Sequence, residues 1–80
     1  MSLVPLTQTA PGEETECFEP DSTWVSRICW DGLGVVVRFK DGFACRYPGT
    51  TIDDYRALED DPDPGHTIRT VYYFRPYQPL

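Results

Sequence analysis

The chain has 80 residues and a net charge of −6, with 40% hydrophobic, 14% aromatic and 25% charged residues. This length allows one small domain, and no apolar run approaches the roughly 18 residues that a membrane-spanning helix needs. Neutralising nucleic-acid phosphates takes an excess of Lys and Arg, so the acidic balance argues against a strongly nucleic-acid-binding chain. Composition and spacing therefore indicate a small, soluble, non-enzymatic β-rich domain.

The first 21 residues differ in composition from the rest of the chain. They hold five acidic side chains and no Lys or Arg, whereas residues 22–80 carry eight acids and seven bases. Three prolines interrupt this stretch, and it has no apolar periodicity that could offset its ordering entropy. We predict an acidic flexible N-terminal arm at residues 1–21 and a folded domain at residues 22–80. The arm lacks the cationic start and long apolar region of a signal peptide, which predicts a cytoplasmic protein.

Three cysteines are present, at positions 17, 29 and 45. The count is odd and neither a Cys-x-x-Cys nor a Cys/His zinc spacing occurs, so the sequence indicates neither a disulfide framework nor a structural metal site. We interpret Cys29 and Cys45 as small buried hydrophobic residues; a nucleophile pair of Cys45 and His66 stays an alternative without a local signature. The acidic loop at residues 60–66 lacks the EF-hand spacing and is expected to be solvated. We predict no metal and no cofactor.

The secondary structure begins with three segments rich in β-branched and aromatic residues, separated by Gly-containing turns. This pattern predicts an antiparallel meander over residues 23–30, 35–39 and 43–47. Thr51 then suits the N-cap of a short helix, because Asp54 follows three positions later in the first turn. The apolar residues at 68–74 predict a fourth strand. The expected fold class is α+β, a small antiparallel β-meander with one short helix packed on one face, in the order β-β-β-α-β.

Hairpin parity predicts the loop between the second and third strands, because directly opposed residues of an antiparallel pair share a face. A two-residue turn would place Val37 opposite Arg46 and mix charge with the core. A three-residue loop at 40–42 places Val37 opposite Cys45 instead. We predict the longer loop, with Gly42 at positive φ in a bulge.

Short motifs occur at residues 26–28, 37–42, 45–49 and 51–58, and Gly65, Ile68-Arg69 and Tyr72 follow them. These motifs resemble the KTSC domain, with the last group similar to its closing motif. This small domain is found at the C-terminus of some lysyl-tRNA synthetases and alone in small bacterial and phage proteins. The resemblance covers residues 22–77 and implies a small α+β fold. Cys45 here takes the place of one tyrosine of the family's Tyr-x-Tyr, and only His66-Thr67 stands where the family carries aromatic and polar residues. The family has no established activity, and its synthetase context implies RNA binding.

Strand parity also predicts an arginine-bearing sheet face opposite the helix. Arginine forks and an aromatic plane suit phosphate binding and base stacking, although the same alternation is typical of the solvated face of a half-buried sheet. Two functions stay open: a binding module for RNA through this face, and a protein-interaction or regulatory module that uses its aromatic edge or its acidic arm. The candidate binding residues are Arg27, Arg38 and Arg46, joined by Arg69, Tyr73 and Arg75 if the fourth strand forms.

Overall fold

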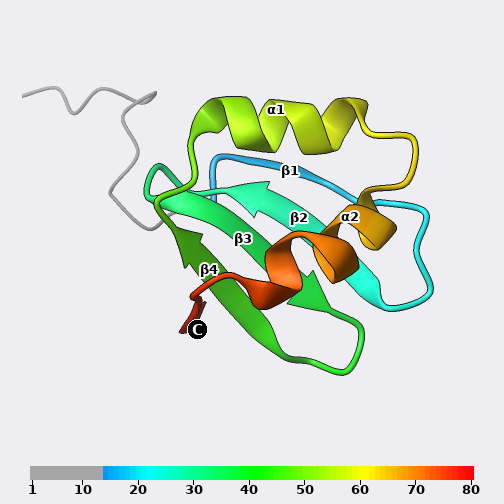
Figure 1. The fold of residues 1–80 in the computed structure, drawn as a ribbon. Coiled ribbons are helices and arrows are strands. Elements are labelled where there is room, and N and C mark those ends of the chain that lie inside the picture. Colours follow the sequence, from blue (N-terminus) through cyan, green and yellow to red (C-terminus); the bar gives the residue numbers. More distant parts are fainter. Residues whose placement is uncertain (1–13) are drawn as a thin grey trace, which may run out of the picture.

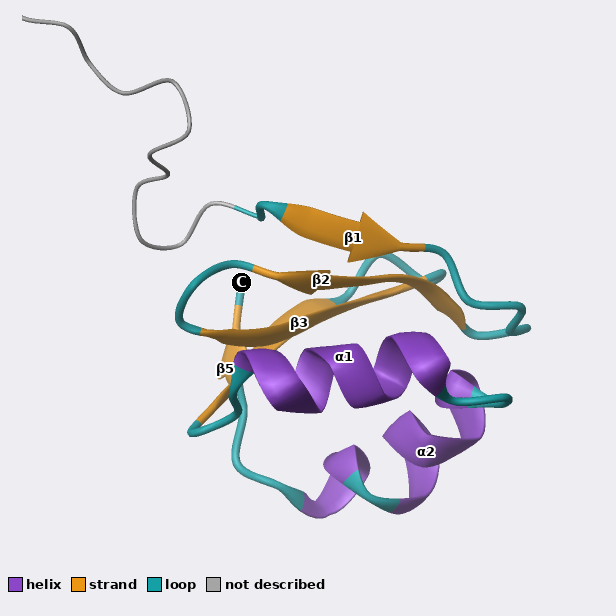
Figure 2. Ribbon diagram, turned by 90° about the horizontal axis from the view of Figure 1, so that it is seen from above, coloured by secondary structure: helices purple, strands orange, loops and turns teal. Residues whose placement is uncertain are grey.

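The structure, a computed structural model, describes residues 14–80. Five antiparallel strands form one sheet in the order β1-β2-β3-β4-β5, and two helices cover one face of it (Figures 1 and 2). The predicted α+β class is therefore confirmed. The elements are β1 (Glu16–Phe18), β2 (Val25–Trp30), β3 (Gly34–Phe39), β4 (Ala44–Pro48), α1 (Ile52–Asp60), α2 (Pro64–Thr70), the short 3-10 helix η1 (Tyr72–Phe74) and β5 (Gln78–Pro79).

The meander has the predicted register. Val37 lies opposite Cys45 across β3 and β4. The loop is closed by Gly42, whose backbone N–H donates to the Phe39 carbonyl at 3.0 Å. Gly42 adopts φ +98°, as the three-residue loop requires.

The core lies between the sheet and the helices. The inward-facing residues of β2, β3 and β4 pack against the buried sides of α1 and α2. Phe43 lies just beyond the hairpin loop, before β4 begins, and is therefore 44% exposed. The buried cluster is formed by Val25, Ile28, Val35, Val37, Cys45, Tyr47, Tyr55, Leu58, Ile68 and Tyr72.

Helix α1 begins as predicted. The Thr51 side chain accepts a hydrogen bond from the Asp54 backbone N–H, and the Asp54 carboxylate accepts one from the Thr51 N–H, which forms a capping box. Tyr55 and Leu58 lie three positions apart and are both buried, so this face of the helix packs on the sheet. Within residues 14–80, no helix combines the length and the apolar character needed to cross a bilayer.

The predicted fourth strand at residues 68–74 is wrong, since this segment is helical. Asp63 is the N-cap and accepts a hydrogen bond from the His66 N–H at 3.2 Å, and Pro64 occupies the first turn, where a missing N–H costs nothing. Ile68 of α2 and Tyr72 of η1 are both buried in the core beneath the sheet. The acidic loop thus serves as a cap for α2.

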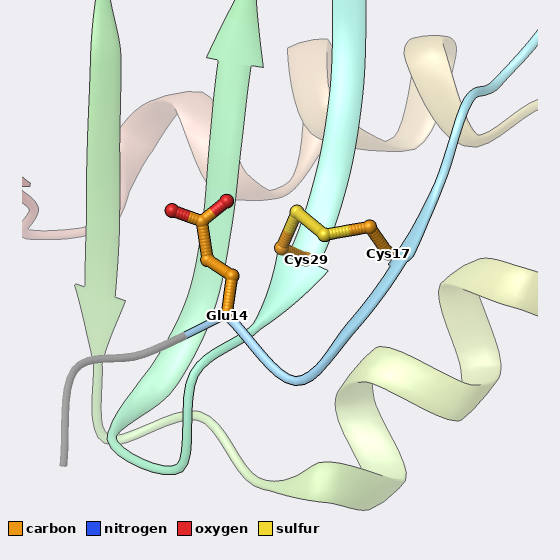
Figure 3. A group of neighbouring side chains, drawn as sticks. All are labelled: Glu14, Cys17 and Cys29. Carbon is orange, nitrogen blue, oxygen red and sulfur yellow. A yellow bond between two sulfur atoms is a disulfide. The ribbon is translucent and has the colours of Figure 1, made fainter. Parts of the chain in front are cut away.

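The predicted boundary of the N-terminal arm at residue 21 also needs correction. Residues 14–21 are part of the folded unit: β1 pairs with the edge of β2, with Cys17 opposite Cys29, and these two cysteines form a disulfide (Figure 3). Phe18 packs edge-on against Tyr55 of α1, with ring centroids 5.8 Å apart. The expectation of no disulfide is wrong, because strand pairing rather than sequence spacing brings the cysteines together. The rest of the predicted arm lies outside the described residues.

Replacing Gly42 tests the loop. Since an added Cβ would meet no atom within 4 Å, the cost of Gly42→Ala comes from backbone conformation alone, and we expect a loss of roughly 1–2 kcal/mol in the free energy of unfolding. Urea denaturation measures it. Gly42→Asn should cost less, because Asn tolerates positive φ; an unchanged or stabilised Gly42→Ala variant would contradict the assigned loop.

Truncation tests whether β1 belongs to the domain. A chain that begins at Ser22 loses the disulfide and the Phe18 ring, so its free energy of unfolding should fall by at least about 1 kcal/mol relative to a chain that begins at Glu14. Thermal denaturation of both chains makes the comparison. Equal melting temperatures would show that β1 contributes nothing to stability and would restore the boundary at residue 21.

Candidate binding surfaces

The face of the sheet opposite the helices carries three of the predicted arginines. Arg27 on β2 lies directly opposite Arg38 on β3, and Arg46 on β4 lies opposite Val36. Their strand positions therefore agree with the parity argument. Like charges directly opposite one another destabilise a sheet unless counter-charges are near, so the partners of these arginines decide what the face can bind.

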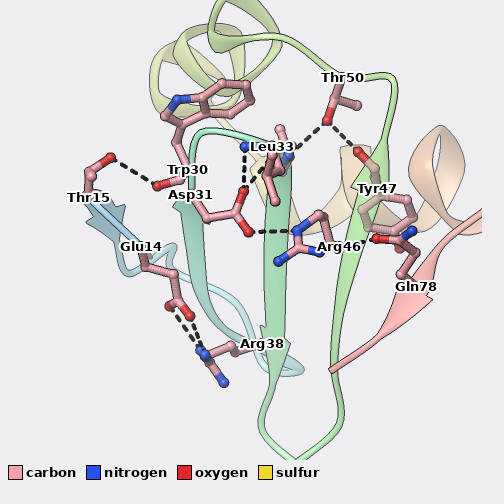
Figure 4. A network of polar contacts seen from close by, with 12 residues as sticks. Glu14, Thr15, Trp30, Asp31, Leu33, Arg38, Arg46, Tyr47, Thr50 and Gln78 are labelled. Carbon is pink, nitrogen blue, oxygen red and sulfur yellow. Dashed lines mark hydrogen bonds and ion pairs between the residues drawn. The ribbon is translucent and has the colours of Figure 1, made fainter. Parts of the chain in front are cut away.

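Two of these arginines are paired with carboxylates from the segment around β1. Glu14 accepts a hydrogen bond from Arg38 Nε at 3.1 Å and forms a second contact with Arg38 Nη2 (Figure 4). Glu19 contacts Arg27 Nη2 at 3.4 Å. The hydrogen bond with Glu14 raises the pKa of the Arg38 guanidinium. The segment around β1, which the sequence predicts to be part of a flexible arm, thus supplies counter-charges to the arginine-bearing face of the sheet.

Arg46 has a structural partner inside the fold. Its Nε donates to Asp31 Oδ2 at 2.6 Å, and the Asp31 side chain is 0% exposed. Asp31 Oδ1 accepts from the backbone N–H groups of Leu33 at 2.8 Å and Gly34 at 3.0 Å (Figure 4). Both oxygens of this buried carboxylate are thus paired within the fold, and the Arg46 guanidinium is tied to the turn between β2 and β3.

The other three predicted site residues do not lie on the sheet. Arg69 is on α2, where its guanidinium stacks over the Trp24 ring at 5.7 Å. Arg75 follows η1 and stacks over Tyr72 at 4.7 Å. Tyr73 belongs to η1. The six predicted residues are therefore not assembled into one face, because the segment that would have brought the last three there is helical.

A groove lined by aromatic rings lies on the other face, between the β3–β4 hairpin and η1. Its volume is about 730 Å³, within the range of roughly 300–1,000 Å³ typical of ligand pockets. The elements that carry its lining residues, the loop that joins β3 to β4 and the orange-red segment that follows α2, can be found in Figure 1. We call this the aromatic groove; its rings belong to Trp24, Phe39, Phe43, Tyr47, Tyr73 and Tyr77.

The walls of the aromatic groove are largely uncharged. Lys40 and Asp41 are the only residues with ionised side chains among those that line it. Burial raises the pKa of the Cys45 thiol and of the Tyr47 hydroxyl above their usual values, so both groups are neutral at neutral pH. A neutral thiol is a poor nucleophile, so Cys45 suits apolar contact better than the nucleophilic pairing with His66.

Several large apolar side chains are exposed at and beside the groove. Tyr73 is 65% exposed and the adjacent Phe74 is 80% exposed, and Tyr77 is also exposed. Exposed aromatic clusters of this kind mark interaction sites in soluble proteins. Sequence reasoning missed the groove because its rings come from four separate parts of the chain, and because Tyr73 was assigned to a strand. The run of aromatic residues near the C-terminus was the available signal.

Comparison with protein-family models, with curated proteins and with solved structures finds no match to this chain.

The buried carboxylate offers a test of the polar network. Asp31→Ala leaves Arg46 without its carboxylate partner and two backbone N–H groups unpaired, so we expect a loss of about 3–5 kcal/mol in the free energy of unfolding. Glu19→Ala is the matched control, since it removes an exposed arginine partner and should cost little. Urea denaturation of both variants measures the difference. Similar small losses would show that Asp31 does not hold the strands together.

Proposed function

We propose that this protein is a small binding module whose aromatic groove takes an extended, basic, proline-containing segment of a partner protein. The observation that carries the proposal is the groove itself, where six aromatic rings surround about 730 Å³ of largely uncharged space. A site of this composition suits apolar ring contacts and supplies few hydrogen bonds for a small polar ligand.

The chain's own C-terminal segment supports a proline-containing ligand. Tyr77 lies between Pro76 and Pro79, and its ring packs edge-on against Phe43 at 6.0 Å and Tyr47 at 6.5 Å. A proline-flanked segment is thus already accommodated by these aromatic rings. Extended proline-rich peptides dock into aromatic-lined grooves because their conformation is preformed and little entropy is lost on binding.

Charge supports a basic ligand. The chain has a net charge of −6, and such a field increases the rate at which cationic partners are captured. Asp41 lines the groove and could pair with a Lys or Arg that flanks the proline segment. The second ionised group, Lys40, lies on the hairpin loop and is exposed to solvent.

RNA binding through the arginine face, which the resemblance to the KTSC domain implies, has less support. Arg27 and Arg38 are paired with glutamates and Arg46 with Asp31, so an incoming phosphate would have to displace a carboxylate. The protein-interaction alternative therefore becomes the preferred function. Membership of the KTSC family and a cytoplasmic location stay predictions.

Tyr73→Ala tests the groove. The probe is a fluorescein-labelled peptide of repeated Pro-Pro-Leu units with two terminal arginines, and binding is followed by fluorescence polarisation. Loss of an exposed aromatic ring that contacts the ligand should weaken binding by about tenfold or more. Because Tyr73 lies outside the buried cluster, the variant should keep its melting temperature.

Leu33→Ala is the matched control, since Leu33 is an exposed apolar residue that is not part of the groove, and its binding should be unchanged. A peptide with glutamates in place of the arginines should bind more weakly. If the labelled peptide fails to bind while single-stranded poly-U RNA binds with strong salt dependence, the groove proposal is wrong and the RNA interpretation replaces it.

A further inference from the structure

Three metal-binding side chains converge beside the edge of the sheet. The sulfur atoms of Cys17 and Cys29 and a carboxylate oxygen of Glu14 all lie within 4.8 Å of one another. Figure 3 shows Glu14 beside the disulfide, with the two cysteines on neighbouring strands. The cysteines are register partners with Cα atoms 4.1 Å apart, so the pairing of β1 with β2 holds both sulfurs on the same side of the sheet.

We propose that the reduced form of this cluster is a zinc site, with the thiolates of Cys17 and Cys29 and the carboxylate of Glu14 as ligands. Zinc takes thiolate and carboxylate ligands at tetrahedral sites and often keeps a fourth position for water. Thiolates favour zinc over magnesium and calcium, which prefer oxygen alone. Cys17 is exposed, so water can reach the fourth position.

Arg38 is already placed to support such a site from outside. Its Nε donates to Glu14 Oε1 while its Nη2 contacts Glu14 Oε2 (Figure 4). One carboxylate oxygen can therefore bind the metal while the other keeps its hydrogen bond to the guanidinium. Outer partners of this kind orient metal ligands and strengthen binding.

The disulfide and the zinc site exclude one another because they use the same sulfur atoms. A dithiol reductant gives two electrons and two protons to the Cys17–Cys29 bond; this bond breaks, two protein thiols form, and the reductant becomes a disulfide. Zinc then displaces both thiol protons, which pass to solvent. β1 would thus be cross-linked to β2 by a covalent bond under oxidising conditions and by the metal in a reducing compartment, where disulfides are rare.

The experiment uses the full chain reduced with a phosphine, which is itself oxidised to the phosphine oxide and leaves no competing thiol. Cobalt(II), a spectroscopic substitute for zinc, should bind one ion per chain with a thiolate-to-metal charge-transfer band, and zinc should bleach this band. Zinc should raise the melting temperature of the reduced protein and leave that of the disulfide form unchanged. Absence of the charge-transfer band in the reduced protein would overturn the proposal.

Variants distinguish the three proposed ligands from the other cysteine and from a neighbouring glutamate. Cys17→Ser should abolish the charge-transfer band, whereas Cys45→Ala should keep it, because Cys45 is buried elsewhere in the core. Loss of even an outer partner of a metal ligand costs about 10- to 100-fold in affinity, so Glu14→Gln should weaken cobalt binding by at least about tenfold. Glu19→Gln is its matched control and should bind as the parent does. Equal affinities for Glu14→Gln and Glu19→Gln would exclude Glu14 as a ligand.

Discussion

The buried carboxylate of Asp31 is the interaction on which the arrangement of the sheet depends. One oxygen accepts the N–H groups that close the turn between β2 and β3, and the other accepts Arg46 from β4, so a single side chain connects three strands. Beside it, β3 begins at Gly34, where a Cβ would lie 2.6 Å from the Tyr47 carbonyl oxygen. This close approach fixes the register of β3 against β4. A slip of one residue would exchange the side chains of the two faces of the sheet. The Asp31 hydrogen bonds and the close approach at Gly34 therefore determine which side chains each face presents.

Because the register places different side chains on each side of the sheet, the two faces suit different ligands. On the open face, each arginine of the meander has a carboxylate partner, and two of those carboxylates come from the segment around β1. On the helix face, the Phe39 ring packs against Trp24 and Phe43. The Tyr47 ring meets Tyr72 and Tyr77 of the C-terminal segment. A polar ligand must compete with existing ion pairs on the first face. An apolar, extended ligand meets exposed rings on the second, which is why the groove is the stronger candidate.

The attachment of β1 to the rest of the sheet depends on the redox state of its cysteine. This strand has only three residues, and so few backbone hydrogen bonds hold a strand weakly. Its attachment depends on Phe18, on glutamate–arginine pairs and on the two sulfur atoms. A cross-link that can be covalent or metal-based would keep β1 paired with β2 in either redox state. The longer strand β2 is then not left as an open edge that can pair with other chains.

Local sequence determined the features whose energy is local. The three-residue hairpin loop follows from parity and from Gly42, and the start of α1 follows from the capping box of Thr51. Only the tertiary structure decided the rest. Phe18 and Cys17 are ordered by contacts with Tyr55 and Cys29, which are far away in sequence, and the aromatic groove needs rings from separate elements. Residues 68–74 could alternate as a strand or form helical turns. The helical form prevails because it buries Ile68 of α2 and Tyr72 of η1 against the sheet, a tertiary contact that the local pattern does not show.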